Sequence, residues 1–145
     1  MQGVILNIKL KRKEKPIQKK TKESQEINHL NIAYLAAKET EEKKGENIVL
    51  LDVSKLTTLS DYFLIVTANS SAQIEAIARH LEEFLSKYDY KLISKEGVVS
   101  SNWTVLDFGN LIVHIMREEE RSYYKLERFW CNAVLINENQ WKKAS

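Results

Sequence analysis

Cysteine and glycine are scarce in this sequence of 145 residues, and each shortage excludes a class of protein. A single cysteine, Cys131, excludes an internal disulfide, adds no metal-binding cluster and fits a reducing compartment. Four glycines cannot form the G-x-G-x-x-G loop that covers nucleotide phosphates in protein kinases. No run of 18 apolar residues occurs, so we expect a soluble, cytoplasmic protein without a membrane span.

Charge is divided unevenly along the chain. Residues 1–25 carry eight Lys or Arg residues against Glu14 and Glu23, which gives +6, so residues 26–145 carry −4 of the overall +2. Because residues 1–25 also lack apolar periodicity, they are predicted to form a disordered basic N-terminal arm. A solvated tail, a weak contact with RNA phosphates and an organelle-import segment are three interpretations of this arm.

Hydrophobic periodicity predicts the order αββαβββα. A first helix should end near Gly45, and short apolar runs at 47–53 and 61–68 are typical of buried strands. A capping-box pattern from Ser70 to Gln73 begins the second helix, which could also present an anion site at its first turn. The remaining predicted elements are strands at 90–95, 103–108 and 111–116 and a charged helix from Glu118. This order favours an α/β or α+β sheet covered by helices.

The strands at 103–108 and 111–116 flank Gly109-Asn110, a pair typical of a two-residue hairpin turn. Counting outwards from this turn places Trp103, Asp107 and His114 on one face, opposite a largely apolar core face. A catalytic pair would need a nucleophile, and a metal site would need ligand spacing; neither is present in the sequence. We therefore favour a covered or docking surface.

The last helix has two groups of side chains. Tyr123, Leu126 and Trp130 recur at helical spacing and are predicted to face the core. Arg121 and the other basic residues of this helix should form a solvated face with weak ion pairs.

Several ordered motifs between about residues 30 and 136 resemble the ribosomal silencing factor family, also called Iojap-like. They are LLDVSKLTTLSDYFLIVTANSSAQIEAIA, KEG, W-x-x-x-D-F-G-x-x-x-V-H-I-M and E-E-R-S-Y-Y-K-L-E-R-F-W. The resemblance implies an α/β fold with a mixed sheet, related to nucleotidyltransferases but lacking their catalytic carboxylates, and therefore no enzymatic activity, cofactor or metal. On this basis the family domain covers residues 26–136, and residues 137–145 form a C-terminal tail.

The resemblance also implies a partner. Members of this family bind large-subunit ribosomal protein number fourteen, block small-subunit joining and thereby repress translation, and free members form homodimers. The positions that match the family's characteristic residues, and that we expect to bind the ribosomal protein, are Trp103, Asp107, His114, Arg121, Tyr124, Glu127 and Trp130. The alternatives are a nucleotidyltransferase-like enzyme that uses the Ser70 helix start and an RNA-binding protein that acts through the basic arm.

Overall fold

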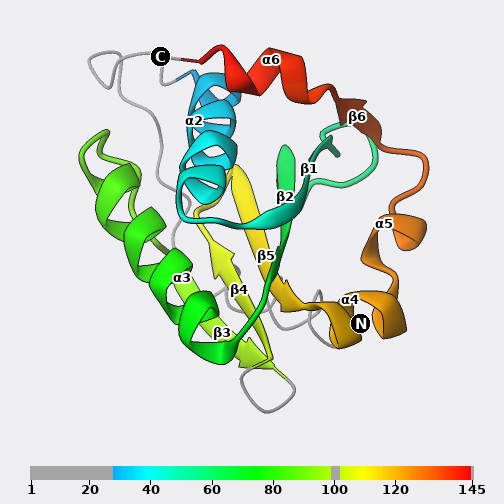
Figure 1. The fold of residues 1–145 in the computed structure, drawn as a ribbon. Coiled ribbons are helices and arrows are strands. Elements are labelled where there is room, and N and C mark those ends of the chain that lie inside the picture. The colour runs from blue at the N-terminus through cyan, green and yellow to red at the C-terminus, as the bar shows by residue number, and fades with distance from the viewer. Residues whose placement is uncertain (1–27, 99–101, 145) are drawn as a thin grey trace.

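A mixed six-stranded sheet forms the centre of the protein (Figure 1). The structure, a computed structural model, describes residues 28–98 and 102–144. In chain order, the elements are α2 (His29–Glu42), β1 (Glu46–Asp52), β2 (Tyr62–Ala68), α3 (Ser71–Ser86), β3 (Ser94–Val98), β4 (Trp103–Asp107), β5 (Leu111–Arg117), α4 (Glu118–Tyr124), α5 (Leu126–Phe129), β6 (Val134–Ile136) and α6 (Glu138–Lys142). The strand order is β3-β4-β5-β2-β1-β6. Only β2 and β5 pair in parallel; the other neighbours are antiparallel. The predicted α/β class with a mixed sheet is confirmed, whereas kinship with nucleotidyltransferases stays a prediction.

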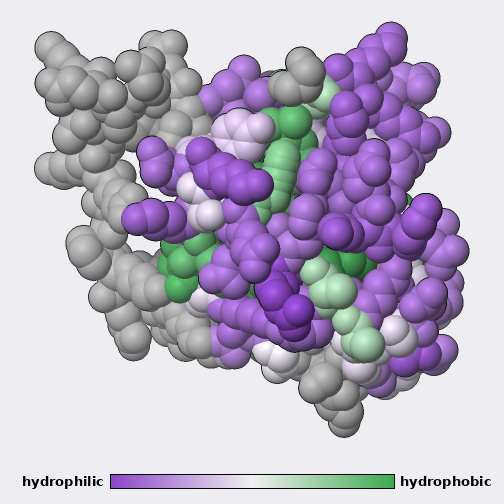
Figure 2. Space-filling model, turned by 60° about the vertical axis from the view of Figure 1, so that its left-hand side comes forward, coloured by the Kyte–Doolittle hydropathy of each residue, from purple (hydrophilic) through white to green (hydrophobic). Residues whose placement is uncertain are grey.

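Helices α2, α3 and α6 gather on one face of the sheet (Figure 1). The predicted cap of α3 is present, because the Ser70 hydroxyl accepts a hydrogen bond from the Gln73 amide at 3.0 Å. The Gln73 side chain in turn accepts from the Asn69 amide at 2.6 Å, one residue earlier than in a standard capping box. The α3 residues that face the core are Ile74, Ile77, Ala78, Leu81 and Leu85. Their outer neighbours are polar, so the side formed by α2 and α3 is largely hydrophilic, with small hydrophobic areas (Figure 2).

Gly45 makes the close return from α2 to β1. Its amide donates to the Thr40 carbonyl at 2.8 Å. A Cβ at this position would lie 2.6 Å from the Val66 side chain and 2.9 Å from the Thr40 carbonyl oxygen. The end of the first helix is therefore where the sequence predicted it, and a side chain has no room there.

The second face of the sheet carries its own hydrophobic cluster, formed with α4 and α5. Its buried members are Leu51, Val53, Leu59, Phe63, Ile65, Trp103, Val105, Ile112, Met116, Leu126 and Trp130. The central strands β2 and β5 are thus buried on both faces, as their almost continuous apolar sequences allow.

Three predictions about the elements and their burial are wrong. Strand β3 begins at Ser94, four residues later than expected. The last helix is not continuous, because Lys125 takes a left-handed conformation (φ 48°) and separates α4 from α5. Tyr123, expected in the core, is 79% exposed.

The stretch expected as a C-terminal tail, 137–145, contains a helix in its described residues. Asn137 begins α6 with a reciprocal capping box, and Trp141 is buried in the first hydrophobic cluster. The Lys38 ammonium donates to the Ala144 carbonyl at 2.7 Å and ties this end to α2. The predictions for residues 1–25 lie outside the described residues. In the described part, no helix has the length and apolar character that a membrane span requires.

Candidate functional site

The hairpin β4–β5 has the predicted register. Trp103 lies opposite Met116 and Asp107 opposite Ile112. Gly109 supplies the positive φ of the bend (95°), and the Asp107 carboxylate accepts from its amide at 2.8 Å. Asp107 therefore stabilises the turn that sets which side chains share a face.

Trp103 and His114 share one face and contact each other directly. The indole N–H donates to His114 Nδ1 at 3.2 Å, and both side chains are fully buried. Above them, the ring of Tyr124 from α4 lies 5.0 Å from the indole. Of the two interpretations left open for this face, covered or docking, burial agrees with the covered one: the Tyr124 ring of α4 packs on Trp103, and Asp107 is only 1% exposed.

The hydrogen bond defines the state of the imidazole. Since His114 Nδ1 accepts the indole proton, the proton of the neutral ring sits on Nε2. Complete burial lowers the pKa of His114 from 6.5 to about 3, so the ring is neutral at physiological pH. A triad-like arrangement would need a carboxylate on Nδ1, and that position is taken by Trp103.

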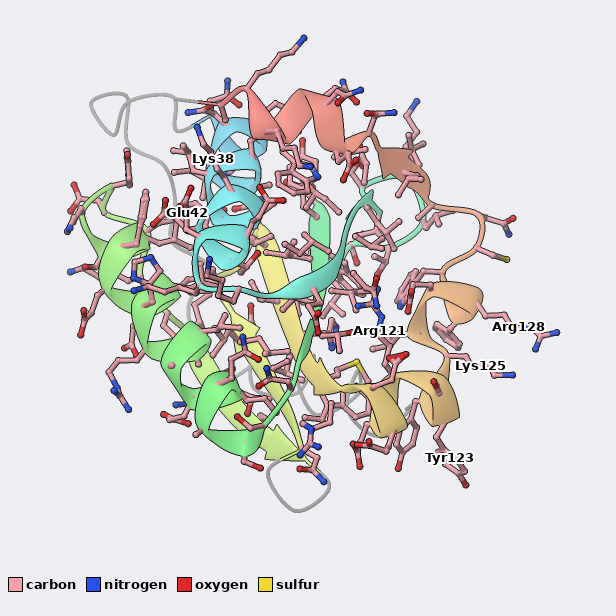
Figure 3. The ribbon with its side chains drawn as sticks, viewed as in Figure 1. Lys38, Glu42, Arg121, Tyr123, Lys125 and Arg128 are labelled. Atoms are coloured by element: carbon pink, nitrogen blue, oxygen red, sulfur yellow. The ribbon has the colours of Figure 1, made fainter. Side chains whose placement is uncertain are left out.

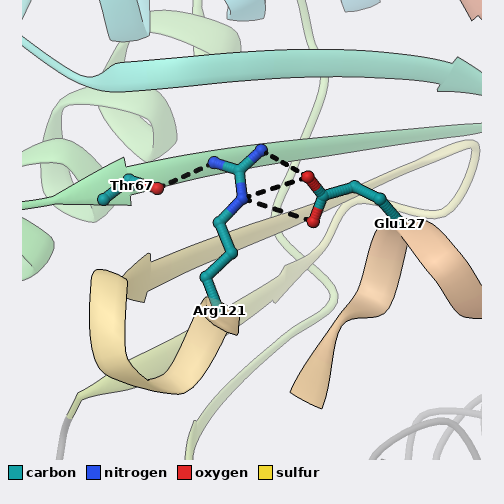
Figure 4. A network of polar contacts seen from close by, with 3 residues as sticks. All are labelled: Thr67, Arg121 and Glu127. Atoms are coloured by element: carbon teal, nitrogen blue, oxygen red, sulfur yellow. Dashed lines mark hydrogen bonds and ion pairs between the residues drawn. The ribbon is translucent and has the colours of Figure 1, made fainter. Parts of the chain in front are cut away.

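Arg121 connects α4 to the sheet and to α5 (Figure 4). Its guanidinium donates to the Thr67 hydroxyl at 2.8 Å and to the Glu127 carboxylate at 2.9 Å. Arg121 is only 7% exposed, whereas the Glu127 side chain is 40% exposed. The left-handed turn at Lys125 brings these two residues, which a straight helix would hold apart, into a charge-assisted contact.

Trp130 closes the second face at the end of α5. Its ring meets Phe63 edge-on, with the centroids 4.9 Å apart, and it is 9% exposed. Of the seven expected contact residues, only Tyr124 and Glu127 keep substantial accessible surface. The structure thus gathers all seven around β4, β5, α4 and α5, but it places most of them beneath the surface.

Three side chains that the sequence did not single out as contacts point outwards from the same helices. Tyr123, Lys125 and Arg128 project from α4, the intervening turn and α5 (Figure 3). Two of them line a shallow groove of about 420 Å³, whose full lining is Asn47, Glu118, Arg121, Ser122, Lys125, Glu127 and Arg128. Sequence reasoning missed these side chains because it did not predict the break at Lys125, which neither Gly nor Pro marks.

The features that an enzyme would need are weak in the described residues. The Ser70 helix start is capped by the chain's own side chains, which occupy the amides of Asn69 and Gln73. Within residues 28–98 and 102–144, no group of three or more His, Cys, Asp or Glu residues is placed to hold a metal ion.

Comparisons with known proteins agree on one family. The family model described as "Ribosomal silencing factor during starvation" matches residues 21–145. The ribosomal silencing factor of Bacillus subtilis is 35% identical over 77% of this chain and 94% of its own length. The chloroplastic protein Iojap of Zea mays is 38% identical over 74% of this chain and 46% of its own length. A crystal structure of a Chromobacterium violaceum protein superposes with a TM-score of 0.66 at 34% identity, over 70% of this chain and 84% of that one.

Proposed function

Because the chain belongs to the ribosomal silencing factor family, we propose that it binds the large ribosomal subunit and represses translation by keeping the small subunit away. The observation that carries this proposal is the family match, which extends over the whole described fold. The protein acts by occupying a surface and not by catalysis. The partner on the subunit is large-subunit ribosomal protein number fourteen.

The α4–α5 region is the proposed contact with that ribosomal protein. Tyr124 and Glu127 touch the partner directly, since they combine accessible surface with fixed positions. Trp103 holds Tyr124 from below, and Arg121 aims the Glu127 carboxylate. A preorganised contact of this kind loses little conformational entropy on binding.

The other family positions have supporting roles in this proposal. His114 and Trp130 fill the space beneath the two helices, and Asp107 fixes the hairpin bend. The net charge of −4 over residues 26–145 favours encounter with a basic ribosomal protein. The free protein is expected to be a cytoplasmic homodimer, and mass measurement by light scattering tests its oligomeric state.

Co-sedimentation with separated ribosomal subunits tests the proposal. The full chain should migrate with large subunits and leave small subunits unoccupied. Tyr124→Ala should weaken this association by tenfold or more, because a truncated interface aromatic commonly costs about 2 kcal/mol. Tyr88→Ala is the matched control, since Tyr88 is a 45% exposed tyrosine just beyond α3. Equal binding by both variants would contradict the proposed α4–α5 contact. Migration of the protein with small subunits would contradict the proposed function.

A further inference from the structure

The outermost aromatic ring of the α4–α5 region is held by its neighbours although it faces solvent. Tyr123 is 79% exposed, and its ring meets that of Tyr124 edge-on, at 4.9 Å and 82°. The Tyr124 ring lies 5.0 Å from the buried indole of Trp103. Three rings thus connect the core to the surface, so Tyr123 offers a supported, flat apolar face to solvent at low entropic cost.

Two cations of the α4–α5 region, Lys125 and Arg128, have no carboxylate partner among the described residues. Arg117 lies 3.8 Å from Glu119, and Arg121 is neutralised by Glu127 at 2.9 Å. Within the part of the chain that the structure describes, Lys125 and Arg128 form no ion pair.

The backbone and the groove direct these cations outwards. The left-handed conformation of Lys125 ends α4, and Arg128 follows one turn later on α5 (Figure 3). Both residues line the groove of about 420 Å³ and stand on the same side of the molecule as Tyr123. Two carboxylates also line the groove. Glu127 is paired with Arg121, whereas Glu118 forms no ion pair within the described residues.

We propose that Tyr123, Lys125 and Arg128 form an RNA-binding corner that holds one unpaired nucleotide. The base stacks on Tyr123, and the flanking phosphates meet Lys125 and Arg128. An acidic peptide would match the two cations, whereas an RNA strand matches both the cations and the flat ring, because every base has a face that stacks on an aromatic side chain. The combination therefore favours RNA. The inference rests on the proposed function, because the RNA of the large subunit supplies the nucleotide.

Binding of the full chain to a labelled, unstructured oligoribonucleotide of about ten nucleotides tests this corner, with fluorescence anisotropy read at several salt concentrations. Tyr123→Ala should weaken binding about five- to a hundredfold, the effect of losing one stacked base. The double variant K125A/R128A should make the slope of log K against log salt shallower by about 1.4, since each single-strand phosphate contact contributes about 0.7. The basic arm is present in every variant and adds the same background.

Matched controls come from the end of α3, where a tyrosine and two lysines are also exposed. Tyr88→Ala and the double variant K87A/K91A should leave affinity and slope unchanged. Test and control variants that behave alike would overturn the proposal.

Photo-crosslinking of the chain to large subunits separates this inference from the proposed function. The corner predicts an adduct between Tyr123 and a ribosomal RNA nucleotide. An adduct to a ribosomal protein instead would overturn the RNA assignment while supporting the subunit contact. Failure of the wild-type chain to bind subunits, with the oligonucleotide results intact, would remove the proposed function and leave the RNA-binding corner.

Discussion

Trp103→Phe tests whether the indole is a structural support beneath α4. The substitution keeps an aromatic ring in the buried site but deletes the N–H that donates to His114 Nδ1 at 3.2 Å. A buried acceptor left without its donor costs about 1–3 kcal/mol. The smaller ring adds about 1 kcal/mol of lost packing. We expect the free energy of unfolding to fall by about 2–4 kcal/mol, a large share of the 5–15 kcal/mol typical of a domain.

A double-mutant cycle with His114→Leu isolates the hydrogen bond. Either single substitution orphans one buried polar atom, whereas the double substitution removes both, so the two losses should fall short of additivity by about 1–3 kcal/mol. Equilibrium urea unfolding followed by far-ultraviolet circular dichroism measures all four proteins at pH 7.5. Additive losses would refute the coupled pair. A Trp103→Phe protein of full stability that no longer binds large subunits would refute the burial of the indole and restore it as a direct contact.

Three further predictions concern packing, protonation and the ion pair. Gly45→Ala should destabilise the fold by about 1–3 kcal/mol through the clash at its Cβ, whereas Gly97→Ala, with no atom within 4 Å, should be nearly neutral in urea unfolding. Because the folded pKa of His114 is about 3 against 6.5 unfolded, the unfolded state binds the extra proton and stability falls with pH below 6.5. By pH 5, protonation of His114 in the unfolded state should lower the free energy of unfolding by about 2 kcal/mol. His114→Leu should remove that part of the pH dependence, and an unchanged pH dependence in the variant would contradict the prediction. Arg121→Met should cost about 1–3 kcal/mol and reduce hydrogen-exchange protection in α4 and α5, because it leaves a partly buried carboxylate unpaired. Arg117→Met, which removes a 3.8 Å contact to the exposed Glu119, should cost under about 0.5 kcal/mol. Equal effects of the two arginines would count against a structural role for the Arg121–Glu127 pair.

The hairpin could be predicted from sequence because its determinants are local. Gly109 and Asn110 set the bend, and the two-residue period of strands then fixes every pair from Trp103 to Met116. That register did not decide whether the face with Trp103, Asp107 and His114 would be open to solvent or covered by helices. Its apolar members were a signal for burial, since strands covered on both sides carry apolar residues on both faces.

The break at Lys125 had no comparable signal. A lysine rarely adopts positive φ, and here the conformation is stabilised by tertiary contacts, above all the Arg121–Glu127 pair that it makes possible. The C-terminal helix, by contrast, did have a signal in the sequence. Asn137 and Gln140 form an N-x-x-Q capping pattern immediately before Trp141, so α6 could have been predicted in place of a tail.

Subunit joining measured by light scattering is the most direct test of a silencing role. Large subunits are preincubated with the full chain, small subunits are added, and the rise in scattering that marks joined ribosomes is recorded. Preincubation should slow or abolish that rise in proportion to the large subunits occupied, and Tyr124→Ala should restore it, whereas Tyr88→Ala should not. Normal joining on large subunits that demonstrably carry the protein would contradict the proposed steric block.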